Sequence, residues 1–122
     1  MRLMVVDDSN LIRTRISKVL GLGKVGSIAL VGLAKNGVEA VRIAKATQPD
    51  VITMDLTMPE MDGLPCIATI LQMMPNTRIL VVSALTDKTT AIQALKLGAR
   101  GFLSKPFTDD ELQLALLDLM DQ

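Results

Sequence analysis

Histidine, tryptophan and tyrosine are absent from this chain, which contains one cysteine, Cys66, and two phenylalanines in 122 residues. A single cysteine excludes an internal disulfide. Without histidine, a zinc site built from the usual nitrogen and sulfur ligands is excluded as well. Any metal ion bound here would therefore be held by oxygen atoms.

The chain also lacks an excess of charge and long hydrophobic runs. Its 13 basic and 13 acidic residues cancel, which leaves no general positive field for nucleic acid. No run reaches the roughly 18 apolar residues of a membrane-spanning helix, and the N-terminus lacks the pattern of a signal peptide. We therefore expect a cytoplasmic protein that binds neither DNA nor membrane and folds as one domain over residues 1–122.

Short apolar strands alternate with amphipathic helices along the sequence. The spacing predicts strands at 2–6, 28–33, 51–55, 79–83 and 101–104. Helices are predicted to begin near Ser9, Asn36, Gly63, Asp87 and Thr108. On the second helix, Val38, Val41 and Ala44 are predicted to face the core. Strands that are apolar along their whole length are typical of a parallel sheet covered on both faces, so the pattern predicts a doubly wound α/β domain.

Gly21, Gly23 and Gly26 match the G-x-G-x-x-G pattern of dinucleotide-binding loops. That pattern binds a pyrophosphate only where it leaves a strand and opens a helix. Here a predicted helix precedes the glycines and a predicted strand follows them. We interpret them as residues that end a helix and form a turn.

Polar residues follow four of the predicted strands. Asp7 and Asp8 follow the first strand, Asp55 ends the third, Ser83 ends the fourth and Lys105 follows the fifth. Taken singly, the acids could be helix caps, Ser83 a loop hydroxyl and Lys105 a solvated charge. The carboxyl ends of parallel strands share one edge of a sheet, where α/β proteins place their sites, so together these residues indicate a functional site.

The three acids predict a cation site. Carboxylates a few ångströms apart repel one another, by several times more at a partly buried edge than in water. A cluster of oxygen ligands suits Mg²⁺, and Lys105 would neutralise the remaining charge. A carboxylate can also be a nucleophile toward a phosphoryl group, and Asp55, which leaves the central strand, is the best placed. The residues thus favour Mg²⁺-assisted phosphoryl transfer to Asp55.

Four segments, "VVDDS", "MDLTMPEMDG", "VVSA" and "GFLSKPF", follow one another along the chain. In this order they resemble the receiver domain of bacterial two-component response regulators. The resemblance implies a flavodoxin-like fold with strand order 2-1-3-4-5 and five helices. It also implies a signalling phosphoacceptor that takes a phosphoryl group from a sensor histidine kinase on Asp55. Such a domain is not an enzyme toward other substrates, and it catalyses only its own phosphorylation and dephosphorylation.

The resemblance assigns roles around the metal ion. Mg²⁺ would be bound by the carboxylates of Asp8 and Asp55 and by the backbone carbonyl of Thr57, while Asp7 would act mainly through bound water. Ser83 and Lys105 would each contact a phosphoryl oxygen.

Other assigned roles concern the signal itself. The peptide bond between Lys105 and Pro106 would be cis. Ser83 and Phe102 would form the switch that remodels the surface of the fourth helix, fifth strand and fifth helix, which recruits a downstream effector protein. Thr57 and Leu85 occupy positions that tune loss of the phosphoryl group, and since neither is an acid or amide, slow self-dephosphorylation is expected.

Several alternatives stay open at this point. An aspartate-nucleophile phosphohydrolase would use similar groups, but it needs a second aspartate where this chain has Thr57. The domain could be a free-standing chemotaxis regulator or the N-terminal part of a larger protein with a DNA-binding or methylesterase output. It could act as a monomer or as a phosphorylation-dependent dimer.

Overall fold

In the computed structural model, which describes residues 1–23, 25–84 and 88–122, five strands alternate with five helices. The strands are β1 (Arg2–Val6), β2 (Ala29–Ala34), β3 (Val51–Met54), β4 (Arg78–Ala84) and β5 (Gly101–Lys105). The helices are α1 (Asn10–Gly21), α2 (Gly37–Thr47), α3 (Gly63–Met73), α4 (Lys88–Leu97) and α5 (Asp109–Met120). The predicted strands are found within one residue of their predicted ends. Asp87, the predicted start of the fourth helix, lies outside the described residues.

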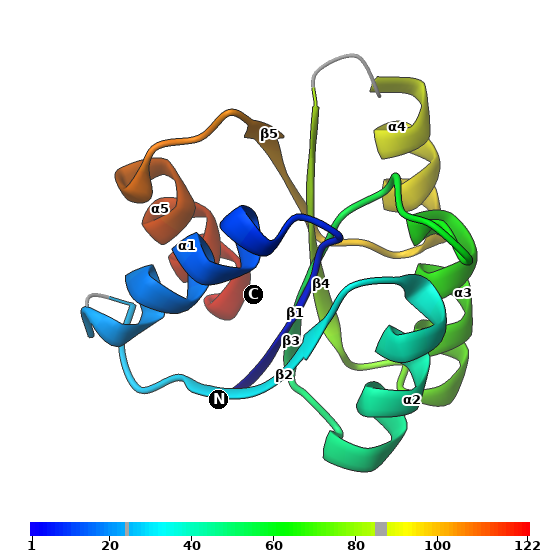
Figure 1. Cartoon of the computed structure of the whole chain (residues 1–122), viewed down its shortest axis with the longest axis horizontal. Coiled ribbons are helices and arrows are strands. Elements are labelled where there is room, and N and C mark those ends of the chain that lie inside the picture. Colours follow the sequence, from blue (N-terminus) through cyan, green and yellow to red (C-terminus); the bar gives the residue numbers. More distant parts are fainter. Residues whose placement is uncertain (24, 85–87) are drawn as a thin grey trace.

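The strands form one parallel sheet in the order β2-β1-β3-β4-β5. Helices α1 and α5 cover one face, and α2, α3 and α4 cover the other (Figure 1). This confirms the predicted doubly wound α/β class. The strand order reverses between β1 and β3, whose carboxyl ends therefore flank the crevice where such sheets bind ligands.

Side chains of the central strands alternate between two apolar clusters. Met4 and Ile52 join the cluster under α2, α3 and α4, whereas Val5 and Leu80 join the cluster under α1 and α5. The alternation follows from the pleat of a strand. The same alternation fixes the direction of the residues that follow the strands. Asp7 and Asp55 point to the α1 and α5 side of the sheet, as Val5 does.

Two details differ from the prediction. β2 is an edge strand and is not uniformly buried, since Leu30 and Leu33 are 40% and 44% exposed. On α2, Val38 does not face the core but is 51% exposed, whereas Ala40 and Ala44 are buried. The small side chains allow α2 to lie close to the sheet, and the larger Val38 falls outside this contact.

Side-chain caps begin three of the helices. Ser9 Oγ accepts the N–H of Ile12, Asn36 Oδ1 accepts the N–H of Glu39, and Thr108 forms the predicted capping box with Glu111. These bonds satisfy N–H groups that no helical carbonyl reaches. The Ser9 cap starts α1 directly after Asp7 and Asp8, which keeps both acids at the sheet edge. Within the described ranges, no helix has the length and apolar character to cross a membrane.

Candidate functional site

The acids following β1 and β3 are held by the sheet itself. The N–H of Asp7 donates to the carbonyl of Ala34 at 3.0 Å, and the N–H of Asp55 donates to the carbonyl of Val6 at 2.9 Å. Strand pairing thus extends one residue beyond each strand and brings the two side chains together. Asp7 and Asp55 are buried, with 1% and 5% exposed, whereas Asp8 is exposed.

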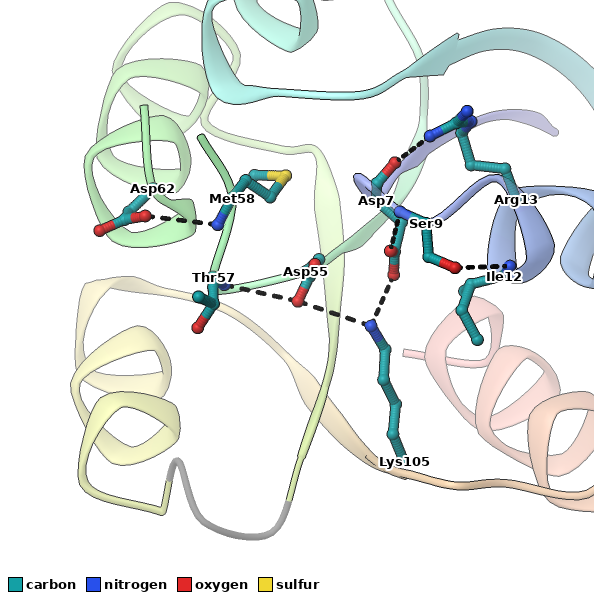
Figure 2. Close-up of polar contacts among 9 residues, drawn as sticks. All are labelled: Asp7, Ser9, Ile12, Arg13, Asp55, Thr57, Met58, Asp62 and Lys105. Carbon is teal, nitrogen blue, oxygen red and sulfur yellow. Dashed lines mark hydrogen bonds and ion pairs between the residues drawn. The ribbon is translucent and has the colours of Figure 1, made fainter. Parts of the chain in front are cut away.

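Asp7, Asp8 and Asp55 each offer a carboxylate oxygen, and these oxygens all lie within 4.8 Å of one another. Both oxygens of Asp7 are engaged by the protein: Oδ1 accepts the N–H of Ser9 at 2.9 Å, and Oδ2 accepts Lys105 Nζ at 2.8 Å (Figure 2). Asp7 therefore serves the turn and the lysine, while Asp8 is the acid that faces solvent.

Lys105, at the end of β5, brings a positive charge to the two buried acids. Its Nζ lies 2.8 Å from Asp7 Oδ2 and 3.6 Å from Asp55 Oδ1. Its side chain is 23% exposed, so the pair is screened less than a surface pair. The peptide bond between Lys105 and Pro106 is cis.

Burial raises the pKa of Asp55 to about 7, and the charge of Asp7 contributes to the same rise. Lys105 and the N–H of Thr57 oppose the shift without cancelling it. The cause is that a buried carboxylate loses hydration and faces a second negative charge. Near neutral pH, Asp55 is therefore only partly ionised. A further cation beside the acids would favour the ionised form.

The loop between β3 and α3 is anchored by two glycines. Gly63 N–H donates to the carbonyl of Leu56 at 2.9 Å, and a Cβ on Gly63 would lie 2.5 Å from the carbonyl oxygen of Asp55. Gly37 N–H donates to the carbonyl of Met61 at 3.1 Å, and a Cβ there would also collide with Met61. Only glycine permits these approaches. The role of Gly37 was not predicted from the sequence, although the dipeptide Asn36-Gly37 at a predicted helix start was an available signal.

Within the same loop, Thr57 is exposed, and its N–H donates to Asp55 Oδ1 at 3.4 Å. The N–H of Met58 donates to Asp62 Oδ1 at 3.3 Å. These bonds hold the backbone of the loop around the acid. Leu85, the other predicted tuning position, lies outside the described residues.

Ser83 and Phe102 lie on neighbouring strands. Ser83 is 1% exposed near the end of β4, and its register partner on β5 is Ser104. Phe102 is half-buried and packs against the apolar cluster under α2, α3 and α4. It also lines an apolar cavity of about 310 Å³ together with Lys88, Ala91, Ile92 and Leu95.

The donor set fits a hard divalent cation. In the part of the chain that the structure describes, the ligand groups that converge at the edge are three carboxylates, which Mg²⁺ prefers, with no softer cysteine or histidine ligand among them. Crowding of three acids with one lysine also leaves negative charge that a cation would neutralise.

Fold and site together define a doubly wound α/β domain with an acidic cluster and a lysine at its switch point. The response regulator receiver domain family matches residues 3–117, and the chain belongs to this family.

Relatives of the chain include a chemotaxis protein and a protein-glutamate methylesterase. It is 37% identical over 116 residues to the chemotaxis protein CheY of Listeria monocytogenes, covering 95% of each chain. It is 45% identical over 108 residues to the protein-glutamate methylesterase/protein-glutamine glutaminase of Archaeoglobus fulgidus, covering 87% of this chain and 30% of that protein. Its structure is similar to that of a chain in the crystal structure of the CheX-CheY-BeF3-Mg²⁺ complex from Borrelia burgdorferi, with a TM-score of 0.90 and 26% identity. The match covers 98% of this chain and 89% of that chain.

Proposed function

We propose that this receiver domain accepts a phosphoryl group on Asp55 from a sensor histidine kinase and then controls an effector protein. The observation that carries the proposal is the position of Asp55: it is buried at the switch point, among two further acids and Lys105. A nucleophilic carboxylate needs this combination, since the incoming phosphoryl group is itself negatively charged.

In the proposed step, an oxygen of Asp55 attacks the phosphorus, a P–O bond forms, and the P–N bond to the kinase histidine breaks. The bonding electrons leave with the imidazole, which takes up a proton. Lys105, already 3.6 Å from Asp55 Oδ1, would exchange its contact with the carboxylate for one with a phosphoryl oxygen. Asp8, Asp55 and the backbone carbonyl of Thr57 would hold Mg²⁺, whose positive charge would offset that of the carboxylates and of the phosphoryl group.

Intact-mass measurement with acetyl phosphate and Mg²⁺ tests the acceptor. The wild type should gain one phosphoryl group and Asp55→Asn none, whereas Asp50→Asn, at the opposite edge of the sheet, should behave as wild type. Absence of a gain on the wild type, or equal labelling of Asp55→Asn, would overturn the proposal.

The two adjacent acids should have unequal roles in Mg²⁺ binding. Asp7 already uses both oxygens within the protein, which supports Asp8 as the direct ligand and Asp7 as the residue acting through water. Asp8→Ala should therefore weaken Mg²⁺ binding more than Asp7→Ala does, as measured by titration of each variant with Mg²⁺ alone. The opposite order would contradict the assignment.

The effector should bind the α4-β5-α5 surface, with Ser83 and Phe102 as the switch. Ile92 and Leu95 on α4 and Leu114 and Leu117 on α5 are apolar and at least 42% exposed. Phe102 lines the apolar cavity together with Ile92 and Leu95. A pull-down from the cognate cell extract with and without beryllofluoride should capture an effector only in the activated state. Ile92→Asp should lose it while Asp55 is still phosphorylated.

Similarity to CheY supports a chemotaxis regulator that controls a partner protein. The methylesterase of Archaeoglobus fulgidus supports a second output, in which the receiver controls an attached catalytic domain. The complete reading frame distinguishes the two outputs. Three points stay predictions. They are the cytoplasmic location, the oligomeric state (monomer or phosphorylation-dependent dimer), and slow dephosphorylation owing to Thr57 and Leu85.

A further inference from the structure

Arg13, on the first turns of α1, reaches back to the acidic edge. Its Nη1 donates to the backbone carbonyl of Asp7 at 2.6 Å (Figure 2). Its Nη2 lies 3.4 Å from Asn10 Oδ1. Long helical side chains lean toward the N-terminus of their helix, which explains how Arg13 reaches a residue six positions earlier. The arginine is half-buried and lies at the rim of the site.

The carbonyl of Asp7 belongs to the peptide unit that leads into Asp8. A peptide unit is planar, so a bond that fixes this carbonyl also fixes the N–H of Asp8 and the direction in which the chain enters that residue. The N–H of Ser9 bonds Asp7 Oδ1 at 2.9 Å on the other side of Asp8. The turn that carries Asp8 is therefore tied before and after it.

We propose that Arg13 is a positioning residue for the cation site: by holding the Asp7 carbonyl, it keeps the Asp8 carboxylate beside those of Asp7 and Asp55. The inference rests on the proposed function, because it concerns the same acids. Asp8 needs such support more than its neighbours do. Asp7 and Asp55 are buried and held by strand pairing, whereas Asp8 is exposed and lies between the strand and the helix.

Arg15 offers a matched control two residues along the same helix. It has the same charge, but its Nε lies 3.2 Å from Asp109 Oδ1 and its guanidinium stacks 4.7 Å from the centre of the Phe107 ring. Its described contacts are thus to α5 and to the segment before α5, and not to the acids of the cation site. Comparing the two arginines separates the bond to Asp7 from a general loss of positive charge or of helix stability.

The experiment titrates Arg13→Met, Arg13→Lys and Arg15→Met with Mg²⁺ alone, without phosphodonor, and follows backbone amide resonances by NMR. Arg13→Met should raise the Mg²⁺ dissociation constant roughly 10-fold, the lower end for losing a group that orients a metal ligand. In the metal-free protein, the Ser9 amide of Arg13→Met should also exchange faster with solvent. Arg13→Lys, which keeps one donor and the charge, should show a smaller loss, and Arg15→Met should remain within about twofold of wild type.

Wild-type Mg²⁺ affinity in Arg13→Met would overturn the inference, and so would an equal loss in Arg15→Met. An unchanged exchange rate of the Ser9 amide would overturn it as well. If Arg13→Met does not fold, Arg13→Lys decides, because an affinity and an exchange rate no different from those of Arg15→Met would leave no role for the guanidinium. Failure of the proposed function would appear elsewhere, as a wild type that binds Mg²⁺ but gains no phosphoryl group.

Discussion

The two edges of the sheet use charged residues in opposite ways. At the amino edge, Asp50 accepts the N–H of Arg2 at 2.8 Å, the Arg2 guanidinium donates to the carbonyl of Thr47, and Arg78 donates to the carbonyl of Met120 at 2.7 Å. Each charge there satisfies a backbone group, two of them at helix ends. At the carboxyl edge, Asp7 and Asp55 are buried side by side and share one lysine. Charges at the first edge support folding, whereas the crowding of the two buried carboxylates at the second opposes it and leaves them available for chemistry.

The largest expected effect is the change with pH in the stability difference between wild type and Asp55→Asn. The pKa of Asp55 is about 7 in the folded protein against an ordinary value of 3.8, so between these values the folded chain keeps a proton that the unfolded chain loses. The contribution of this group to stability therefore falls as the pH rises from about 4 to about 7. Without Mg²⁺, Asp55→Asn should be more stable than wild type by on the order of 3 kcal/mol at pH 8. Urea unfolding measures the gap, which should nearly vanish at pH 4; a gap that does not change with pH would contradict this.

Loss of the shared lysine should have the next largest effect. Lys105→Met leaves Asp7 buried without its cation, which should lower the free energy of unfolding at pH 8 by about 2 kcal/mol, less than for a fully buried pair because Lys105 is 23% exposed. Added Mg²⁺ should restore part of the loss by binding the folded state. Lys96→Met, an exposed lysine in the last turn of α4, is the control and should change little. Equal effects of the two variants would show that the acids need no lysine.

A third, smaller effect is expected at Thr53, which lies on β3 two residues before Asp55. Its Oγ1 is buried and has no hydrogen-bond partner among the described residues, and its register neighbours Val5 and Leu80 are apolar. Thr53→Val removes the unpaired hydroxyl at nearly constant volume and should stabilise the protein by about 1 kcal/mol. Thermal unfolding measures the gain, and phosphorylation of Asp55 should be unchanged. Destabilisation would mean that the hydroxyl has a partner.

The smallest effect is expected at the amino edge. Asp50→Asn removes the charge but keeps an oxygen that accepts the N–H of Arg2, so stability should change by less than about 0.5 kcal/mol. Added salt should also change it little. A loss of stability as large as that expected for Lys105→Met would show that charges at the two edges do not differ in their effect on folding.

The fold and most of the candidate site could be predicted because both follow from strand order. Apolar strands alternating with helices leave few topologies, and polar residues at strand ends then meet at one edge. The exposure of Leu30 and Val38 could not be predicted in this way, because it depends on which neighbours cover β2 and on how closely α2 approaches the sheet. The bond from Arg13 to Asp7 and the contact of Gly37 with Met61 depend on the course of loops, which periodicity does not describe.

The exposed strand β2 also bears on whether another chain can pair with the side of the sheet. An apolar edge with Leu30 and Leu33 on its surface could serve as a template for a sixth strand from another chain. Between its pairings with Leu3 and Met4 the register shifts, so that Val31 is an extra residue in β2. Such a bulge bends the edge strand and interrupts the regular hydrogen-bond pattern that a strand from another chain would have to match. The extra residue in β2 therefore disfavours strand addition along the uncovered side of this edge strand.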